Sequence, residues 1–410
     1  MINKRIYTEI INKIKKDSFK KNPCFYIYDL NNITEKISCL RKNMPKSVRV
    51  YYSVKANPSD KIIRHMKNNS YIKGVEVSSI GEINKALKSF NPQNIIFPGP
   101  GKTSYEIKSA MKKKIGLFVV ESYLEAFRIQ QIAKEEKIKS VNVLIRININ
   151  YQSKVNLDYK SSSTQLTSGF SSKLGIDEEK IYLTLDLFKK LDRLIIRGIH
   201  VMSGSEELNY KNLLNYFEYV FSLINKLKKS RFNTKIIDFG GGFGIDYESK
   251  NRQLDIVSLG KEFNKLIKKF GFEKKTIIFE LGKYLVGESG HYVTEIIDIK
   301  RSMGKWQVIT SGGINHIKRP QEAALNHPTS IINLNKPKLY PDQPFVKNEK
   351  PDIGGPLCTS LDTYCKDLFV KEANIGDLVI TSQLGAYGLT FSPVNFLSHL
   401  LPKEYFIKNY

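Results

Sequence analysis

The sequence contains few of the residues that build disulfide scaffolds or histidine metal sites. Only four cysteines occur in 410 residues, and no two of them form a Cys-X-X-Cys pair. They are too few to staple a chain of this length, so we expect reduced thiols in a cytoplasmic protein. The six histidines show no metal-ligand spacing, and no metal site is predicted.

Long apolar runs are also missing. No stretch reaches the roughly 18 apolar residues that a membrane-spanning helix needs, so no membrane partner is expected. The first 21 residues carry charges throughout, and Ile6, Ile10 and Ile14 fall on one helical face. This pattern predicts a packed amphipathic helix and not a signal or anchor.

The charge is strongly unbalanced, with 65 lysines and arginines against 40 acidic residues and a formal net charge of +25. The lysines are spread along the whole chain, without an arginine-rich stripe, zinc-finger spacing or an RNA-binding aromatic motif. We therefore expect no nucleic-acid partner. A small acidic substrate is compatible with the charge.

Eight short runs of β-branched and aromatic residues alternate with helical patterns. They cover residues 48–54, 74–78, 94–97, 116–120, 141–148, 194–200, 235–239 and 276–280. Alternation of strand and helix is typical of a parallel sheet, and eight units in roughly 240 residues predict a closed (β/α)8 barrel of the TIM type.

A change of pattern near residue 285 predicts a second, mainly β domain. Residues 1–30 are expected to form a helix and a strand that join this domain, residues 31–284 the barrel, and residues 285–410 a C-terminal β-sandwich or β-barrel domain. The chain would thus leave one domain, build the barrel and return.

A lysine stands at the predicted carboxyl end of the first barrel strand. Lys55 follows two tyrosines in the run Tyr51–Asn57, a position that suits imine formation with an aldehyde cofactor. Active residues of barrel enzymes lie at these strand ends. Other functional residue types found there are Glu76 with Ser78, Arg146, His200, Gly240–Gly244 and Glu280.

A glycine run follows the seventh predicted strand. The amides of Gly240–Gly242 can approach an anion closely, while Ser205 can add a hydroxyl and Lys283 a positive charge to the same phosphate. A carboxylate at Glu280 would hold a proton on a pyridine nitrogen. Together with Lys55, these groups specify pyridoxal 5'-phosphate (PLP).

Eight motifs occur in the order of a known family. They are Tyr52–Asn57, Gly74–Glu82, Ile95–Lys102, His200–Ser205, Gly240–Gly244, Glu280–Lys283, Gly355–Asp362 and Gly385–Tyr387. Over nearly its whole length the chain resembles the PLP-dependent decarboxylases of the ornithine/diaminopimelate type, which have the alanine-racemase fold (fold type III).

The resemblance implies roles for individual residues. Lys55 would be the Schiff-base lysine, Glu280 the pyridine partner, and Cys358 the acid that returns a proton to the substrate carbon from the other subunit. A homodimer with shared active sites is therefore implied. Cofactor contacts are implied for Lys55, Arg146, His200, Met202, Ser205, Gly240, Gly241, Gly242, Glu280, Lys283 and Tyr387.

Three departures from the family pattern affect the expected contacts with the substrate, with the pyridine ring of PLP and with its phosphate. Thr359 replaces the acidic residue that meets a distal amine, so a free ammonium would lose a charge-assisted hydrogen bond worth roughly 1.5–3 kcal/mol. Met202 replaces the histidine that stacks on the ring, and either Met202 or His200 would cover it. Lys283 replaces an arginine and loses its bidentate fork.

Further segments resemble a branch that makes citrate-based siderophores. Residues 292–300, 304–306, 326–328 and 396–399 are similar to the staphyloferrin B-type citryl-diaminopropionate decarboxylase, which has a rhizoferrin-type relative that acts on citryl-ornithine. Asp362 and Thr359 would then face the substrate. The nearby His316, Lys318 and Arg319 would hold the citryl end or form a solvated charged run.

These observations predict decarboxylation of an N-citryl diamino acid in carboxylate-siderophore biosynthesis, with citryl-ornithine favoured over citryl-diaminopropionate. A free diamino acid such as ornithine, lysine or diaminopimelate is one alternative substrate. A carrier-bound or nucleotide-linked amino acid is another, because Thr359 suits any capped distal end. A non-catalytic PLP-binding protein is a third interpretation, against which Lys55, Glu280 and Cys358 argue.

Overall fold

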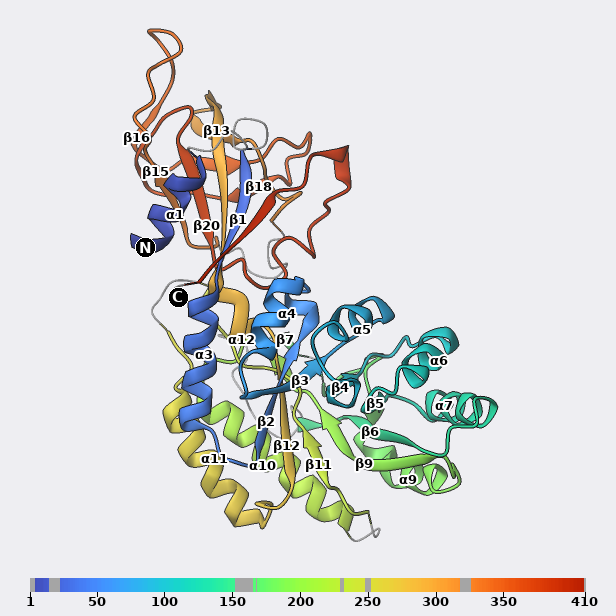
Figure 1. Cartoon of the computed structure of the whole chain (residues 1–410). Coiled ribbons are helices and arrows are strands. Elements are labelled where there is room, and N and C mark those ends of the chain that lie inside the picture. The colour runs from blue at the N-terminus through green and yellow to red at the C-terminus, as the bar shows by residue number, and fades with distance from the viewer. Residues whose placement is uncertain are drawn as a thin grey trace. The chain divides into compact units, whose positions relative to one another are not determined.

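The computed structural model describes residues 4–14, 23–151, 165–166, 168–228, 232–247, 252–317 and 326–408. These residues form two compact units (Figure 1). The barrel unit comprises the described residues of Thr34–Ile245 and Arg252–Leu285, and the β unit those of Met1–Ile33, Asp246–Asn251 and Val286–Tyr410. Asp246 and Tyr247 thus fall in the β unit, although the sequence places them inside the predicted barrel segment.

The barrel unit is built on a closed parallel sheet, as predicted. Its strands are β2 (Val48–Ser53), β3 (Ile72–Glu76), β4 (Ile95–Phe97), β5 (Leu117–Val120), β6 (Val141–Asn148), β9 (Leu194–Val201), β11 (Ile236–Asp238) and β12 (Thr276–Leu281). Each strand pairs with the next in this order, and the pairing of β12 with β2 closes the ring. Because all pairs are parallel, every carboxyl end reaches the same rim.

Helices between the strands cover the outside of the barrel (Figure 1). They are α3 (Leu30–Asn43), α4 (Asp60–Lys67), α5 (Ile80–Ala86), α6 (Ser104–Lys112), α7 (Tyr123–Glu135), α9 (Ile181–Phe188), α10 (Tyr210–Leu227) and α11 (Ile256–Phe270). Shorter elements are η1 (Val54–Ala56), η2 (Pro92–Asn94), η4 (Glu178–Lys180), β7 (Gln165–Leu166), β8 (Ile176–Asp177) and β10 (Gly204–Ser205). Within the described ranges, no helix combines the length and apolar character needed to cross a membrane.

An aromatic cluster fixes the two strands that end the barrel. Phe217 of α10 packs on Phe239 and Phe263, with ring centroids 4.6 and 4.7 Å away. It also lies 5.3 Å from Phe279 of β12. Burial of one such ring contributes about 1.5–3 kcal/mol, so this cluster holds the ends of β11 and β12 firmly in place.

The β unit contains a mainly antiparallel sheet, which confirms the prediction of a second β domain. Strand β1 (Cys24–Asp29) pairs with β13 (Gly290–Ser302) and with β21 (Lys403–Ile407). The remaining elements are α1 (Lys4–Ile14), η6 (Gly287–Ser289), β14 (Lys305–Thr310), β15 (Thr329–Ile332), β16 (Val346–Glu349), β17 (Asp352–Gly354), β18 (Thr363–Cys365), β19 (Val370–Ala373), β20 (Leu378–Ser382) and η7 (Phe396–Ser398). Helix α1 buries Ile6 and Ile10 against Phe25 and Val293, as its amphipathic pattern predicts.

The close approach of β9 and β11 leaves no room for a side chain at Gly198, and this can be tested. A Cβ at this position would overlap the carbonyl oxygen of Ile236, its partner on β11. We expect Gly198→Ala to lower the free energy of unfolding by about 1–3 kcal/mol or more, because the strands would have to separate. Gly101→Ala is the matched control, since a Cβ there meets nothing within 4 Å. Urea denaturation measures both, and equal midpoints would contradict the prediction.

Candidate active site at the carboxyl end of the barrel

Lys55 lies at the rim of the barrel, in the short helix η1 directly after β2. Its Nζ forms an ion pair with Glu76 Oε1 at 2.9 Å, and Ser78 Oγ donates to the same oxygen at 3.1 Å. The Glu76 side chain is fully buried, whereas 43% of the Lys55 side chain is exposed. A buried carboxylate therefore holds in place an amine that a ligand can still reach.

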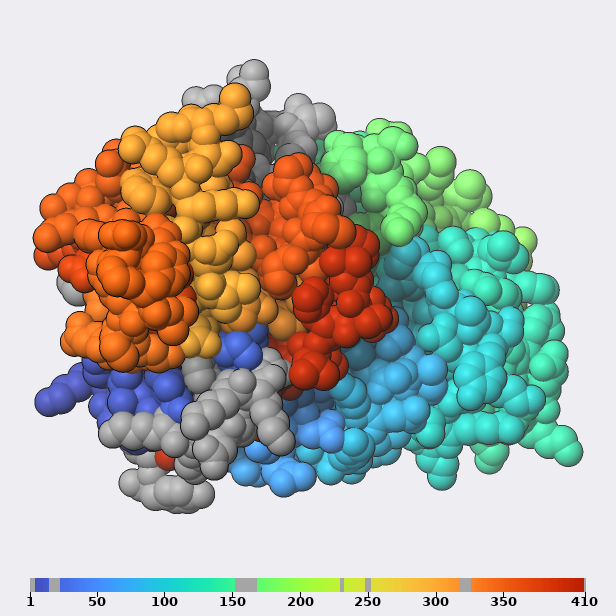
Figure 2. Space-filling model, turned by 90° about the horizontal axis from the view of Figure 1, so that it is seen from above, coloured from blue at the N-terminus to red at the C-terminus, as the bar shows by residue number. Residues whose placement is uncertain are grey.

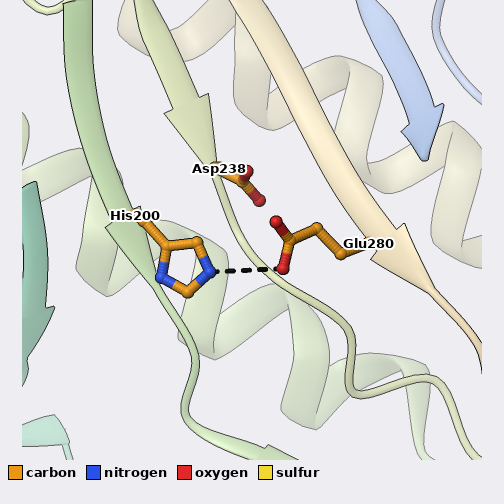
Figure 3. A group of neighbouring side chains, drawn as sticks. All are labelled: His200, Asp238 and Glu280. Carbon is orange, nitrogen blue, oxygen red and sulfur yellow. Dashed lines mark hydrogen bonds and ion pairs between the residues drawn. The ribbon is translucent and has the colours of Figure 1, made fainter. Parts of the chain in front are cut away.

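Three further polar side chains converge from neighbouring strands (Figure 3). His200 comes from β9, Asp238 from β11 and Glu280 from β12, and each is at most 5% exposed. His200 Nε2 lies 3.3 Å from Glu280 Oε2. One N or O atom from each of the three residues lies within 4.8 Å of the others. The closed barrel thus brings one imidazole and two carboxyl groups together in its interior.

The two carboxyl groups have opposite pKa shifts. Burial alone would raise the pKa of Glu280, but the charge and hydrogen bond of His200, with smaller effects of Lys55 and Asp238, lower it below the ordinary carboxyl value. Burial and then the charge of Glu280 raise the pKa of Asp238 well above its ordinary value. Glu280 is therefore the charged member of the pair near neutral pH.

The backbone of the glycine run, which follows β11, turns sharply. Gly240 and Gly242 have φ values of 61° and 110°, which favour glycine. The Gly240 amide donates to Asp238 Oδ1 at 2.9 Å, and the Gly242 carbonyl accepts from the Glu207 amide at 2.9 Å. The run thus lies beside the segment that carries the half-buried Ser205. Because glycines have no Cβ, their backbone groups can be reached by a ligand and can form the cradle that a phosphate requires.

Lys283 stands near the same segment, at the start of α12 (Lys283–Val286). It forms an ion pair with Glu206, and the two side chains are 16% and 7% exposed. Glu206 has a φ of 69°, a left-handed conformation that is strained for a side chain of this size. The positive charge expected to meet a phosphate is thus already opposed by a carboxylate.

Met202 and His200, the two residues expected to cover the pyridine ring of PLP, have different neighbours. His200 is turned toward Glu280, whereas the Met202 side chain lies against Gly240, where an added Cβ would come within 3.2 Å of it. Met202 therefore borders the glycine run, and His200 borders the buried carboxylate.

Arg146 of β6 takes part in a second buried network. Its Nη1 lies 3.2 Å from Glu121 Oε1, and Glu121 also accepts from the amides of Gly99 at 3.0 Å and Gly175 at 2.9 Å. One carboxylate thus ties an arginine and two loops together at the rim. Arg146 is 8% exposed and is held firmly by this arrangement.

The predicted residues of the β unit lie on and near one loop. Cys358 is exposed, and Thr359 beside it is half-buried. Asp362 was expected to meet the substrate, but it is 3% exposed and accepts from the amides of Ile314 at 2.7 Å and Leu357 at 2.8 Å. Both carboxylate oxygens thus bind backbone, and Asp362 fixes the loop that presents Cys358.

Tyr387, the remaining predicted cofactor contact, has a φ of 63° and packs its ring 6.4 Å from that of Phe391. It also belongs to the β unit. The predicted cofactor residues therefore come from both units, although most of them stand on the barrel.

His316, predicted either to hold the citryl end or to belong to a solvated charged run, is buried inside the β unit. The side chain is 2% exposed, and burial lowers its pKa to about 4, so the ring is neutral. Nδ1 accepts from the Tyr292 hydroxyl at 2.8 Å, and Nε2 donates to the Leu400 carbonyl at 3.0 Å. His316 therefore ties parts of the β unit together. Lys318 and Arg319 lie outside the described residues.

Sequence reasoning missed three carboxylates of the barrel. Asp238 is the last residue of β11, Glu121 directly follows β5, and Glu206 directly follows β10. A signal was present, since acidic residues at the carboxyl end of an apolar strand seldom serve folding alone.

The arrangement fits PLP. Glu280 Oε1 is buried without a hydrogen-bond partner among the described residues, and it can accept from a protonated ring nitrogen. Lys55 supplies an amine, and the glycine run a phosphate cradle. The donors and acceptors required at the aldehyde, ring and phosphate ends of the cofactor are all present on this rim.

Comparison with known proteins gives the same class. The sequence model of the family described as "Pyridoxal-dependent decarboxylase, pyridoxal binding domain" matches residues 30–287. The chain therefore belongs to the pyridoxal-dependent decarboxylases, enzymes that use PLP. This assignment confirms the cofactor and the reaction class expected from the motifs.

Individual relatives cover nearly the whole chain. The chain is 30% identical to a Staphylococcus aureus 2-[(L-alanin-3-ylcarbamoyl)methyl]-2-hydroxybutanedioate decarboxylase, over 97% of both proteins. It is 33% identical to the L-glutamyl-[BtrI acyl-carrier protein] decarboxylase of Niallia circulans, over 94% of this chain and 89% of the relative. Diaminopimelate decarboxylase from Helicobacter pylori, solved with L-lysine, superposes with a TM-score of 0.82 at 26% identity, covering 98% and 94% of the two chains.

Neutral His316 predicts a loss of stability in acid. Its pKa falls from 6.5 to about 4 on folding, so between these values the unfolded chain binds a proton that the folded chain does not. The free energy of unfolding should therefore fall by about 2–3 kcal/mol as the pH drops from 6.5 toward 4. His316→Asn should show a smaller fall in urea midpoint over this range. An unchanged slope would contradict the prediction.

Proposed function

We propose that this chain decarboxylates an N-citryl diamino acid in the biosynthesis of a carboxylate siderophore. The relative from S. aureus carries the argument, because its printed substrate joins an alanin-3-yl group through a carbamoyl to a hydroxybutanedioate, which is a citryl amide. Thr359 fits this class of substrate, since an amide-capped distal amine needs no carboxylate partner.

Bound PLP supplies the electron sink for the bond between the substrate's α-carbon and its carboxylate. Lys55 would hold the aldehyde end of the cofactor through its amine, and Glu76, whose Oε1 lies 2.9 Å from Nζ, would keep that amine at the rim. Anionic Glu280 would accept a hydrogen bond from the protonated ring nitrogen and so keep the proton on that nitrogen.

The remaining barrel residues position the cofactor. The amides of Gly241 and Gly242 and the hydroxyl of Ser205 would bind the phosphate, and Lys283 would contribute its charge. Gly240, whose amide donates to Asp238, shapes the turn. Met202 covers the ring, because it borders the glycine run while His200 is engaged by Glu280. Arg146 and Glu121 hold two loops of the same rim through the amides of Gly99 and Gly175.

Protonation of the product falls to Cys358. Its exposed position at the surface of the β unit suits a thiol that serves the site of a second chain. Asp362 contributes by fixing the Cys358 loop through the Leu357 and Ile314 amides. Tyr387 adds a hydroxyl for the phosphate.

Large exposed apolar side chains support a dimer. Leu361 is 78% exposed beside the Cys358 loop, and Phe391, Leu400 and Leu401 are 60%, 69% and 57% exposed. The red C-terminal part of the chain reaches the surface on the face drawn in Figure 2. A second copy that covers these side chains would remove them from water and receive Cys358 in its own site.

The length of the diamino acid separates two closely related substrates. Sequence analysis favours citryl-ornithine, whereas the alanin-3-yl group in the name of the S. aureus relative favours citryl-diaminopropionate. A second candidate function is decarboxylation of a carrier-bound amino acid. It is favoured by the N. circulans relative, at 33% identity.

Substrate comparison tests the proposal. We expect kcat/KM for citryl-diaminopropionate or citryl-ornithine to exceed that for free ornithine or diaminopimelate by at least about tenfold, as loss of one charge-assisted hydrogen bond predicts. Thr359→Asp should raise turnover of the free diamino acids and lower that of the citryl amides. Thr359→Asn, of the same shape but without charge, is the control. Faster wild-type turnover of free diamino acids, or of a carrier-bound glutamyl group, would refute the citryl assignment.

Shared sites can be tested by mixing inactive chains. Lys55→Ala and Cys358→Ala proteins should each be nearly inactive, but heterodimers would contain one intact site and recover about a quarter of wild-type activity after random exchange. A mixture of Cys358→Ala with the Lys55→Ala/Cys358→Ala double variant should recover nothing. Heterodimers that form without any recovery would exclude a shared site.

A further inference from the structure

Asp238 is a buried carboxyl group beside Glu280 to which the proposed mechanism gives no role. It ends β11, is fully buried, and receives the Gly240 amide at Oδ1. Its Oδ2 has no hydrogen-bond partner among the residues that the structure describes. Figure 3 shows the carboxyl group of Asp238 directed at that of Glu280.

Two carboxyl groups this close inside a protein do not both ionise, because each charge opposes the other in a medium of low dielectric constant. One of the two carboxyl groups therefore carries a proton and is neutral. Electrostatic neighbours of Asp238 include the carboxyl groups of Glu280 on β12 and Glu76 on β3 and the hydroxyls of Tyr51 on β2 and Tyr216 on α10. The His200 ring on β9 also has a nitrogen within 4.8 Å of the Asp238 carboxyl group, but its Nε2 is directed at Glu280 Oε2.

Glu280 has the opposite surroundings. His200 Nε2 lies 3.3 Å from Glu280 Oε2, and the positive charge of Lys55 also lowers the pKa of Glu280. Negative charge is therefore stabilised on Glu280 and not on Asp238. Within the described part of the chain, the hydrogen bond from the Gly240 amide opposes the rise in the pKa of Asp238.

We propose that Asp238 is a permanently protonated carboxylic acid that directs its proton at Glu280 and keeps Glu280 ionised as the acceptor for the cofactor's ring nitrogen. Asp238 is thus a positioning residue, since it acts through Glu280 and not on the cofactor. It adds a donor to the site without adding charge. An ionised Asp238 would instead push the ring-nitrogen proton onto Glu280.

Infrared spectroscopy of the PLP-loaded protein in the absence of substrate tests the protonation state directly. We expect a carboxylic-acid C=O band at about pH 8 that shifts when aspartate is labelled with ¹³C and is lost in Asp238→Asn. Asp255→Asn is the matched control, because Asp255 is the N-cap of α11 and lies outside the site. Absence of the band in the wild type, or its survival in Asp238→Asn, would overturn the inference.

Two substitutions of similar shape test the consequence for the cofactor. Asn keeps an N–H donor toward Glu280, so Asp238→Asn should leave the PLP dissociation constant within about threefold and the ring nitrogen protonated in ¹⁵N spectra of labelled cofactor. Asp238→Leu removes the donor and should weaken PLP binding at least about tenfold. Equal effects of Asn and Leu would refute the inference, and if the Leu variant does not fold, the infrared result still decides.

This inference rests on the PLP site of the proposed function and not on the citryl substrate. Neither readout requires turnover, so an enzyme that prefers another amino acid would leave the result for Asp238 unaffected. Conversely, loss of the infrared band would leave the substrate assignment untouched.

Discussion

Burial of the Glu280 carboxylate is the constraint around which the barrel rim is built. A buried carboxylate is costly unless charges and hydrogen bonds compensate it. Here the compensation comes from His200, Lys55 and a neutral Asp238, each from a different strand or strand end. The main chain of Glu280 is fixed as well, through Gly240 and Ser53. The same contacts that make the charge tolerable also set the place where a ring nitrogen can bind.

Most of the barrel could be predicted from the sequence because each strand is a short run rich in apolar residues and most strand ends carry a polar residue. The relation of Asp238 to Glu280 could not, because it depends on β9, β11 and β12 becoming neighbours. The burial of His316 could not be predicted for a similar reason. It stands beside charged residues in sequence, but the fold pairs it with Tyr292 and buries it.

The residues that match the family model and the residues proposed to select the substrate lie in different parts of the chain. The family match covers residues 30–287, which hold Lys55, Glu280 and the glycine run. Cys358 and Thr359 belong to the β unit. Under the proposed function, a change of substrate can arise in the loops of the β unit while the PLP site of the barrel remains the same. Thr359 would be one such change, since it alters charge without disturbing the contacts of Asp362.

Closure of the barrel through β2 and β12 also dictates when the site can exist. Lys55 follows β2, the barrel strand that is synthesised first. The strand that pairs with β2 to close the barrel is β12, which carries Glu280 and is synthesised last. A ribosome-bound chain that lacks β12 exposes the unpaired edge of β2, a template for association with other chains. The cofactor site is thus assembled in the final step of barrel synthesis, and incomplete chains carry an open sheet edge in its place.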